Sequence, residues 1–278
     1  MDNAGAVLVL GGTGRTGSRI GRALIDQGAA ARTASRSGSA TKFDWDDQQT
    51  YRPALDGVDR VYLVPPNLRV RFADQVAAFL ETAVDAGVRH ITLLSAYGAD
   101  RAPAVIDLAA VERLVAECGG ITHTILRPAW VMQNFTDEHL PLIDDSLTVP
   151  SGGGAEAFVD ADDIAAVAVR TVLEPAAHDG ATYTLTGPAA LTFEDVAAVI
   201  ADVSGRPVKH VDVDQQVWID GAVAAGVPAD YAVMLRWLTG TIIDGHGATP
   251  TGDVEKVLGH PATDLATFAR RNAATWTH

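Results

Sequence analysis

A glycine-rich turn directly after an apolar segment constrains the fold more than any other feature of the chain. The apolar run 7–10 leads into glycines spaced G-x-x-G-x-x-G at 11, 14 and 17, and a helical pattern with apolar residues at 20, 23 and 24 follows. In such a strand–turn–helix unit, one glycine permits the tight turn, one lets the backbone approach a pyrophosphate, and one lets helix and strand pack closely. A glycine turn without a ligand is the alternative. The turn predicts a dinucleotide site made by Gly11, Gly12, Thr13, Gly14, Arg15, Thr16 and Gly17.

Strand and helix patterns alternate through the first half of the chain, which is typical of a parallel, doubly wound sheet. Strands are expected at 7–10, 30–34, 42–44, 60–64, 90–95 and 122–127, and helices at 16–26, from 72 onward and at 106–117. After residue 150 we expect a loop, a helix opened by acidic residues at 160–163, strands at 182–186 and 208–213, and a helix capped by Thr192 with Asp195. The predicted fold is α/β, a Rossmann-type domain at 1–150 with a smaller, interleaved substrate-covering part at 151–278.

Composition excludes several classes of protein. The chain has 278 residues and a net charge of −14, which disfavours a nucleic-acid partner. No apolar run reaches the length of a membrane span, and no signal peptide is visible, so we expect neither a membrane partner nor export. Cys118 is the single cysteine, which fits a cytoplasmic location. The eight histidines lack metal-ligand spacing, so no metal is expected, and an oligomer is possible but cannot be inferred from the sequence.

The residues after the second predicted strand indicate which dinucleotide binds. NAD-binding units usually place an acidic residue there for the ribose 2′-hydroxyl. Here Ser35 and Arg36 stand in a segment that has no acid. A guanidinium group can grip a 2′-phosphate, with Arg15 as a second candidate, so the segment favours NADP(H). A solvated loop arginine is the alternative reading of Arg36.

Further ligand contacts follow from topology, because ligands of such sheets bind beyond the carboxyl ends of the strands. Asp44 and Trp45 are expected near adenine, and Val64 and Pro65 near the ribose and pyrophosphate. Near the nicotinamide we expect the residues at two further strand ends, which are Ser95, Tyr97, Pro128 and Trp130.

The chain lacks the Tyr-x-x-x-Lys pair with which ordinary short-chain dehydrogenases transfer a proton. Tyr97 with Arg101 is the nearest approximation, and arginine does not exchange a proton near neutral pH. No G-x-S-x-G elbow is present either. Tyr97 and Ser95 are therefore the candidate catalytic residues, with water as the other possible proton source.

Four segments resemble the NmrA-like family of atypical short-chain dehydrogenases. They are 11–17 (GGTGRTG), 124–135 (TILRPAWVMQNF), 158–165 (FVDADDIA) and 183–188 (YTLTGP). Residues 130–135 look most like those of festuclavine dehydrogenases, and quinone reductases come next. The resemblance implies a Rossmann fold with NADP(H). Some relatives carry a lysine four residues before the glutamate that matches Glu112, and here that position is Leu108.

The expected function is an NADPH-dependent reductase that transfers hydride to a small hydrophobic or polycyclic iminium, enone, ketone or quinone, with secondary metabolism as the expected setting. The predicted apolar substrate pocket consists of Tyr97, Trp130, Met132, Asn134, Phe135 and Trp218. Two alternatives remain open: a non-enzymatic NADP(H)-binding redox sensor of the NmrA type, and an isomerase or epimerase on the same fold.

Overall fold

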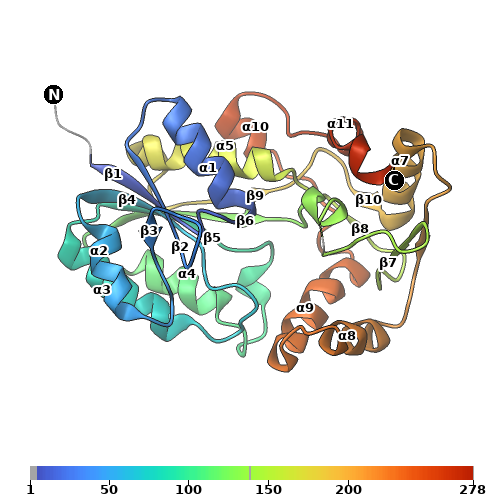
Figure 1. Cartoon of the computed structure of the whole chain (residues 1–278), viewed down its shortest axis with the longest axis horizontal. Helices are drawn as coiled ribbons and strands as arrows, with labels where there is room; N and C mark the ends of the chain where they lie inside the picture. Colours follow the sequence, from blue (N-terminus) through green and yellow to red (C-terminus); the bar gives the residue numbers. More distant parts are fainter. Residues whose placement is uncertain (1–4, 138, 278) are drawn as a thin grey trace. The chain divides into compact units, whose positions relative to one another are not determined.

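The computed structural model, which describes residues 5–137 and 139–277, contains a seven-stranded sheet (Figure 1). Its strand order is β3-β2-β1-β4-β5-β6-β9. The strands are β1 (Ala6–Leu10), β2 (Ala31–Ser35), β3 (Thr41–Lys42), β4 (Val58–Leu63), β5 (His90–Leu94), β6 (Thr122–Pro128) and β9 (Ala181–Leu185). The pairs from β3 through β6 are parallel, so the predicted Rossmann-type fold is confirmed.

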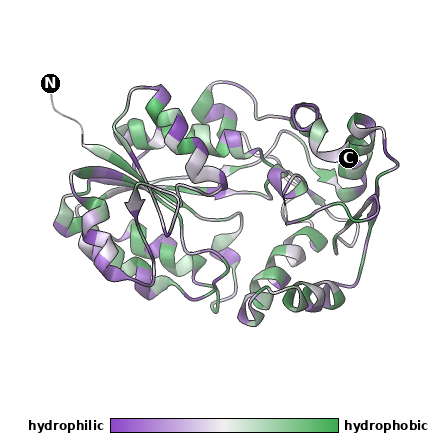
Figure 2. Cartoon of the chain, viewed as in Figure 1, coloured by the Kyte–Doolittle hydropathy of each residue, from purple (hydrophilic) through white to green (hydrophobic). Residues whose placement is uncertain are grey.

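The sheet forms because its central strands are almost continuously apolar, as buried parallel strands require. In β1, the side chains of residues 7–10 are completely buried, and so are those of residues 61–63 in β4. Between strands the chain forms the helices α1 (Arg15–Asp26), α2 (Tyr51–Leu55), α3 (Ala73–Ala86), α4 (Leu108–Ala116), α5 (Ala161–Leu173) and α6 (Pro175–His178). In Figure 2 these helices carry hydrophobic and hydrophilic residues side by side, as helices with one packed face do.

Helix α4 begins later than the sequence predicts, at Leu108 rather than at residue 106. Asp107 stands at the N-cap position of α4, and its buried carboxylate accepts hydrogen bonds from the N–H groups of Phe72 (2.6 Å) and Ala73 (2.9 Å). That carboxylate serves the start of α3 and does not cap α4. Strand β3 is also shorter than expected, because Phe43 leaves it to join a cluster of aromatic rings.

The chain forms two compact units, each composed of separate segments. Unit 1 consists of residues 1–67, 71–127 and 164–183, and unit 2 of residues 68–70, 128–163 and 184–278.

Unit 2 contains two small sheets and most of the C-terminal helices. Strand β8 (Ala155–Glu156) pairs with β10 (Leu191–Thr192) in antiparallel fashion, and β7 (Ser146–Thr148) pairs with β11 (Lys209–Val211) in parallel. The helices are α7 (Phe193–Ser204), α8 (Gln215–Ala224), α9 (Ala232–Ile243), α10 (Asp253–Leu258) and α11 (Leu265–Arg271). Thr192 and Asp195 form the predicted capping box at the start of α7.

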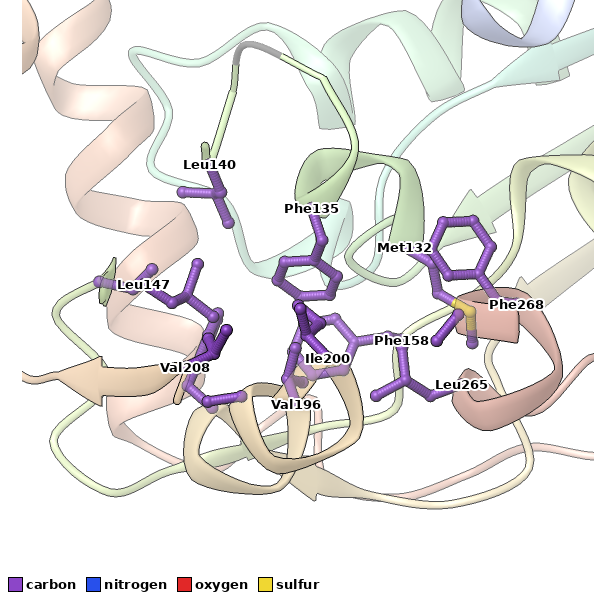
Figure 3. Close-up of a cluster of buried hydrophobic side chains, with 14 of the residues drawn as sticks. Met132, Phe135, Leu140, Leu147, Phe158, Val196, Ile200, Val208, Leu265 and Phe268 are labelled. Atoms are coloured by element: carbon purple, nitrogen blue, oxygen red, sulfur yellow. The ribbon is translucent and has the colours of Figure 1, made fainter. Parts of the chain in front are cut away.

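A hydrophobic cluster organises unit 2 (Figure 3). The ring of Phe135 lies 5.1 Å from that of Phe158 and 6.1 Å from that of Phe193, measured between centroids. Figure 3 shows Val196 and Ile200 of α7 beside Phe135, and Met132 beside Leu265 and Phe268 of α11. These contacts tie the segment after β6 to two C-terminal helices.

The acidic residues at the start of α5 do more than favour the helix dipole. Asp160 is completely buried, and its carboxylate accepts hydrogen bonds from Gln133 Nε2 (2.7 Å), from the N–H of Asp162 (2.9 Å) and from Arg271 Nη2. Asp163 accepts from the N–H of Thr263 at 2.7 Å. The run therefore joins three segments of unit 2.

Across the described residues, no helix is long and apolar enough to cross a membrane.

Candidate functional site

The glycine turn after β1 has the close backbone packing that a dinucleotide site needs. Gly11 has a φ of +64°, which favours glycine, and the Gly14 N–H donates to the Gly11 carbonyl at 2.8 Å. A Cβ at Gly12 would lie 2.5 Å from Thr33 Cβ, and a Cβ at Gly17 would collide with the Gly11 carbonyl oxygen. Larger residues at positions 12 and 17 would therefore separate the turn from β2 and α1 from β1.

The N-terminus of α1 has no side-chain cap. The same is true of α2, α3, α4, α6, α9 and α10, whereas α7, α8 and α11 are capped by the side chains of Thr192, Asp214 and Asp264. The first N–H groups of an uncapped helix, together with the helix dipole, bind anions such as phosphate. Thr16 lies in this first turn and is fixed to the sheet, because the hydroxyl of the fully buried Tyr62 donates a hydrogen bond to Thr16 Oγ1 at 2.9 Å. Burial raises the pKa of Tyr62, so the phenol stays protonated.

The loop after β2 lies against the glycine turn. A Cβ at Gly38 would be 3.1 Å from Thr13 Cγ2, and one at Gly12 would be 3.2 Å from Ser39 Oγ. Ser35 Oγ donates to the Ser37 carbonyl at 2.5 Å and accepts from the Ser39 hydroxyl at 2.9 Å, and both bonds brace the loop. This contact brings Ser35 and its neighbours close to the glycine turn.

Arg36 is exposed, and it makes no ion pair or hydrogen bond with any residue in 5–137 or 139–277. The other arginine of this segment is engaged elsewhere, because Arg32 Nη1 donates to the carbonyls of Ala54 (3.0 Å) and Asp56 (2.8 Å). Of the two, Arg36 is therefore the guanidinium group available for a phosphate.

The structure places the other expected cofactor residues at the ends of their strands. Val64 follows β4 and lies against the turn, since a Cβ at Gly11 would be 2.8 Å from Val64 Cγ1. Trp45 is half-buried, with its ring 5.0 Å from that of Phe43. Asp44 turns its carboxylate toward the N–H of Asp46 at 3.1 Å, so it shapes the loop that carries Trp45. Pro65 also follows β4, and Pro128 is the last residue of β6.

Ser95, a catalytic candidate, has its hydroxyl proton committed to another side chain. It is buried and donates to Glu112 Oε1 at 2.6 Å. Arg127 donates to both oxygens of Glu112, at 2.9 and 2.5 Å, and this hydrogen bonding raises the pKa of Arg127. Ser95 therefore offers lone pairs but no free proton. Sequence reasoning assigned no site role to Glu112, although a glutamate on the apolar face of α4 is a signal that it has a partner.

Tyr97 follows β5 and is half-buried. The Arg101 guanidinium carbon lies 5.8 Å from the centre of its ring, within the range of a cation–π contact. Arginine keeps its proton near neutral pH, so Arg101 cannot relay a proton to or from Tyr97.

The other predicted substrate residues lie in unit 2 and differ in burial. Met132 and Phe135 are 1% and 2% exposed and belong to the hydrophobic cluster, so their contacts in this structure are packing contacts. Trp218 packs partly buried against the cluster and donates its indole N–H to the Thr148 carbonyl at 3.1 Å. Asn134 is half-buried in the turn at 132–135. Trp130 is also partly buried, and its indole N–H has no hydrogen-bond partner.

Sequence reasoning also missed Glu156, a buried carboxyl group in β8. An acidic residue inside the otherwise apolar run 155–159 was the signal that could have found it. Within the described ranges, no three His, Cys, Asp or Glu side chains are grouped so that they could hold a metal ion.

Comparison with known proteins identifies the protein family of the chain. The sequence model of the NmrA-like family matches residues 3–268, and the chain belongs to this family. It is 35% identical to the oxidoreductase YesF of Bacillus subtilis (98% of this chain, 96% of that protein). It is 32% identical to an NAD(P)H azoreductase of Xenophilus azovorans (97% and 99%) and 30% identical to a festuclavine dehydrogenase of Aspergillus fumigatus (97% and 98%). An NADPH-dependent quinone oxidoreductase of Escherichia coli, solved with NADPH, superposes with a TM-score of 0.82 at 25% identity, covering 95% of this chain and 99% of that one.

Proposed function

We propose that the chain is an NADPH-dependent reductase that passes hydride to a small hydrophobic electrophile, such as an iminium, enone, ketone or quinone. At the level of class it is an NAD(P)H-dependent oxidoreductase, as the relatives named for azo, clavine and quinone substrates are. NADP(H) is the cofactor, and the hydride at C4 of its nicotinamide is the chemistry that it supplies.

One observation carries the cofactor part of the proposal. The uncapped start of α1 and the free guanidinium group of Arg36 belong to two loops that touch each other at Gly38 and Thr13. A pyrophosphate at the helix start and a 2′-phosphate at Arg36 match these two anion-binding features. Ser35 and Arg15 are proposed to assist at the phosphates, Val64 and Pro65 at the ribose, and Asp44 and Trp45 at adenine. Ser95, Tyr97 and Pro128 are proposed to border the nicotinamide.

For the acceptor, we assign the binding residues chiefly to unit 2. Trp130 and Trp218 offer aromatic surface with partial exposure, which suits a flat hydrophobic molecule, and Asn134 adds a polar group. Met132 and Phe135 support these residues from the cluster. Orienting the acceptor and excluding water are the protein's main contributions to hydride transfer.

Calorimetry with NADPH and NADH, followed by NADPH oxidation assays over a panel of acceptors, tests the proposal. We expect NADPH to bind at least about tenfold more tightly than NADH, and one class of acceptor to accelerate NADPH oxidation. Tight binding without turnover over the whole panel would contradict the reductase and favour the non-enzymatic sensor. Equal affinities for the two nucleotides would contradict the role of Arg36.

A further inference from the structure

The three serines of the loop after β2 differ in what their hydroxyl groups do. Ser35 Oγ donates its only proton to the Ser37 carbonyl at 2.5 Å, so at 2.9 Å it accepts the proton of the Ser39 hydroxyl. Ser37 itself is exposed, and its hydroxyl forms no hydrogen bond with any residue in 5–137 or 139–277. Two of the serines therefore brace the loop, and the third leaves its hydroxyl group free.

The braced loop is also fixed against the glycine turn. Gly38 has a φ of +80°, which favours glycine, and a Cβ there would lie 3.1 Å from Thr13 Cγ2. A Cβ at Gly12 would lie 3.2 Å from Ser39 Oγ, and the Gly12 N–H donates to the Ala34 carbonyl at the end of β2 at 3.0 Å. All these contacts lie within unit 1. The loop and the turn are therefore held at a defined position relative to each other.

The free hydroxyl group of Ser37 is next in the chain to Arg36, whose guanidinium group is exposed and unpaired within the described ranges. The nearest acidic residues in the sequence are Asp26 and Asp44, so residues 27–43 carry no carboxylate that would repel an anion. A phosphate monoester presents three strong acceptor oxygens, which is more than one guanidinium group satisfies. A cation and a neutral donor in consecutive residues of a braced loop suit such a group.

We propose that Ser37 is a second ligand of the cofactor's 2′-phosphate beside Arg36, and that Ser35 and Ser39 are positioning residues that hold the loop for both. The inference rests on the proposed placement of the 2′-phosphate at Arg36, and it adds the residues that complete the selectivity for NADP(H). NADH has only a hydroxyl group at this position of the ribose. It therefore loses the contacts of Arg36 and Ser37 and keeps those of the glycine turn to the pyrophosphate.

The two kinds of residue contribute in different ways. Ser37 contributes a hydrogen bond to a charged group, which is stronger than one between neutral groups. Ser39 contributes only through the loop, because its proton already goes to Ser35. Without the Ser39 hydroxyl the loop has more conformations to lose when the cofactor binds, which costs conformational entropy.

Calorimetric titration of the full-length protein with NADPH and NADH, two nucleotides that differ only in the 2′-phosphate, tests this assignment. We expect Ser37→Ala to raise the Kd for NADPH about tenfold and to leave the Kd for NADH unchanged. Ser37→Thr keeps the hydroxyl group and is expected to restore most of the affinity for NADPH. Ser39→Ala and Ser35→Ala are each expected to raise the Kd for NADPH about threefold, again without an effect on NADH.

A combined variant separates positioning from direct contact. Where Arg36→Ala and Ser37→Ala are both present, Ser39→Ala is expected to change the Kd for NADPH no further, because the loop has lost the two groups that it positions. Ser204→Ala removes a serine hydroxyl from the end of α7 and is the matched control, in which neither nucleotide is expected to respond. Thermal unfolding of each variant shows whether the fold is intact.

Phosphorus NMR of bound NADPH gives a signature that a general loss of stability does not produce. The resonance of the 2′-phosphate is expected to move in Ser37→Ala, and the resonances of the pyrophosphate are expected to stay in place. Movement of the pyrophosphate resonances alone would overturn the assignment of Ser37.

The remaining outcomes are also decisive. Equal losses of NADPH and NADH affinity in Ser37→Ala, or a loss in Ser35→Ala with none in Ser37→Ala, would overturn the inference. A further loss from Ser39→Ala in the combined variant would overturn its positioning role. The binding results hold whether or not an acceptor is reduced, so a failure of the reductase function is seen separately. If wild type binds both nucleotides equally, the placement of the 2′-phosphate at Arg36 fails, and the assignment of Ser37 fails with it.

Discussion

The hydroxyl of Tyr62 in β4 donates a hydrogen bond to Oγ1 of Thr16 in the first turn of α1, at 2.9 Å. Tyr62 is fully buried, so this bond fixes the start of α1 to the sheet from the inside. A binding surface made of backbone N–H groups depends on this kind of support, because the phosphate contacts need a rigid helix start.

Tyr62→Phe tests that support. Losing one buried hydrogen bond should lower the free energy of unfolding by about 1 kcal/mol, as urea denaturation measures it. The Kd for NADPH should rise a few-fold, because Thr16 loses its positioning partner. As a control, Tyr183→Phe removes the hydrogen bond to His178 at 2.8 Å and should cost similar stability without changing the Kd. Identical Kd shifts in both variants would contradict a specific role for Tyr62.

Arg36→Ala should weaken the binding of NADPH and leave NADH unaffected. A charge-assisted contact with the 2′-phosphate is worth about 1.5–3 kcal/mol, which corresponds to about a 10- to 150-fold rise in Kd. Arg22→Ala removes an exposed arginine of α1 and is the matched control for net charge. The loss should shrink at high salt, since screening weakens the wild-type contact. A parallel loss of NADH binding would show that Arg36 acts on something other than the 2′-phosphate.

Gly17→Ala should abolish NADPH binding and destabilise the protein. The added Cβ collides with the backbone carbonyl of Gly11, which cannot move without opening the turn. Gly119→Ala is the control, because nothing lies within 4 Å of a Cβ there and its φ is not in the left-handed region. Calorimetric titration and thermal unfolding measure both effects. A Gly17→Ala protein with wild-type affinity would refute the predicted approach of the backbone to the pyrophosphate.

Glu112→Gln should destabilise the protein more than Ser95→Ala does. The substitution leaves the partly buried guanidinium of Arg127 facing a neutral amide and should cost about 3 kcal/mol, against about 1 kcal/mol for Ser95→Ala. Because the hydroxyl proton of Ser95 is already given to Glu112, kcat of Ser95→Ala should stay within a few-fold of wild type. A drop of about 100-fold or more in kcat, with the fold intact, would restore Ser95 as a proton donor.

The pH dependence of stability gives a test of Glu156 that needs no ligand. Its pKa rises from the ordinary 4.5 to about 7 on folding, so the folded state binds the proton more tightly. The contribution of this proton to the free energy of unfolding is fully present below pH 4.5. It is lost as the pH rises through 7, by about 3 kcal/mol in total. Between pH 5 and pH 8, the unfolding free energy of wild type should therefore fall relative to that of Glu156→Gln, which lacks the titrating group. A difference that does not change with pH would contradict the raised pKa.

The fold was predictable because local signals agree with each other. The glycine turn, the apolar run of β1 and the pattern of α1 all indicate one strand–turn–helix unit, and the Thr192 capping box appears as predicted. The family resemblance in segment 124–135 is confirmed by the match over residues 3–268.

The rest of the candidate site depends on partners far away in the sequence. Ser95 looked free until the fold brought it to Glu112, seventeen positions away. The apolar run around Glu156 indicates that it is buried, but its surroundings become known only when β8, β10 and the segment around Gly247 come together. Asp160 likewise looked like a residue that favours the helix dipole, although its partner Arg271 lies 111 positions further on.

Transfer of deuterium from NADPH labelled at C4 of the nicotinamide tests the central claim most directly. The two stereoisomers of the labelled cofactor are incubated separately with the protein and malachite green or an enone, whose products keep the new C–H bond. The account predicts that one stereoisomer places a single deuterium on carbon in the product, detected by mass spectrometry, and that the other places none. Folded protein that binds NADPH but yields no deuterated product from either stereoisomer would contradict it.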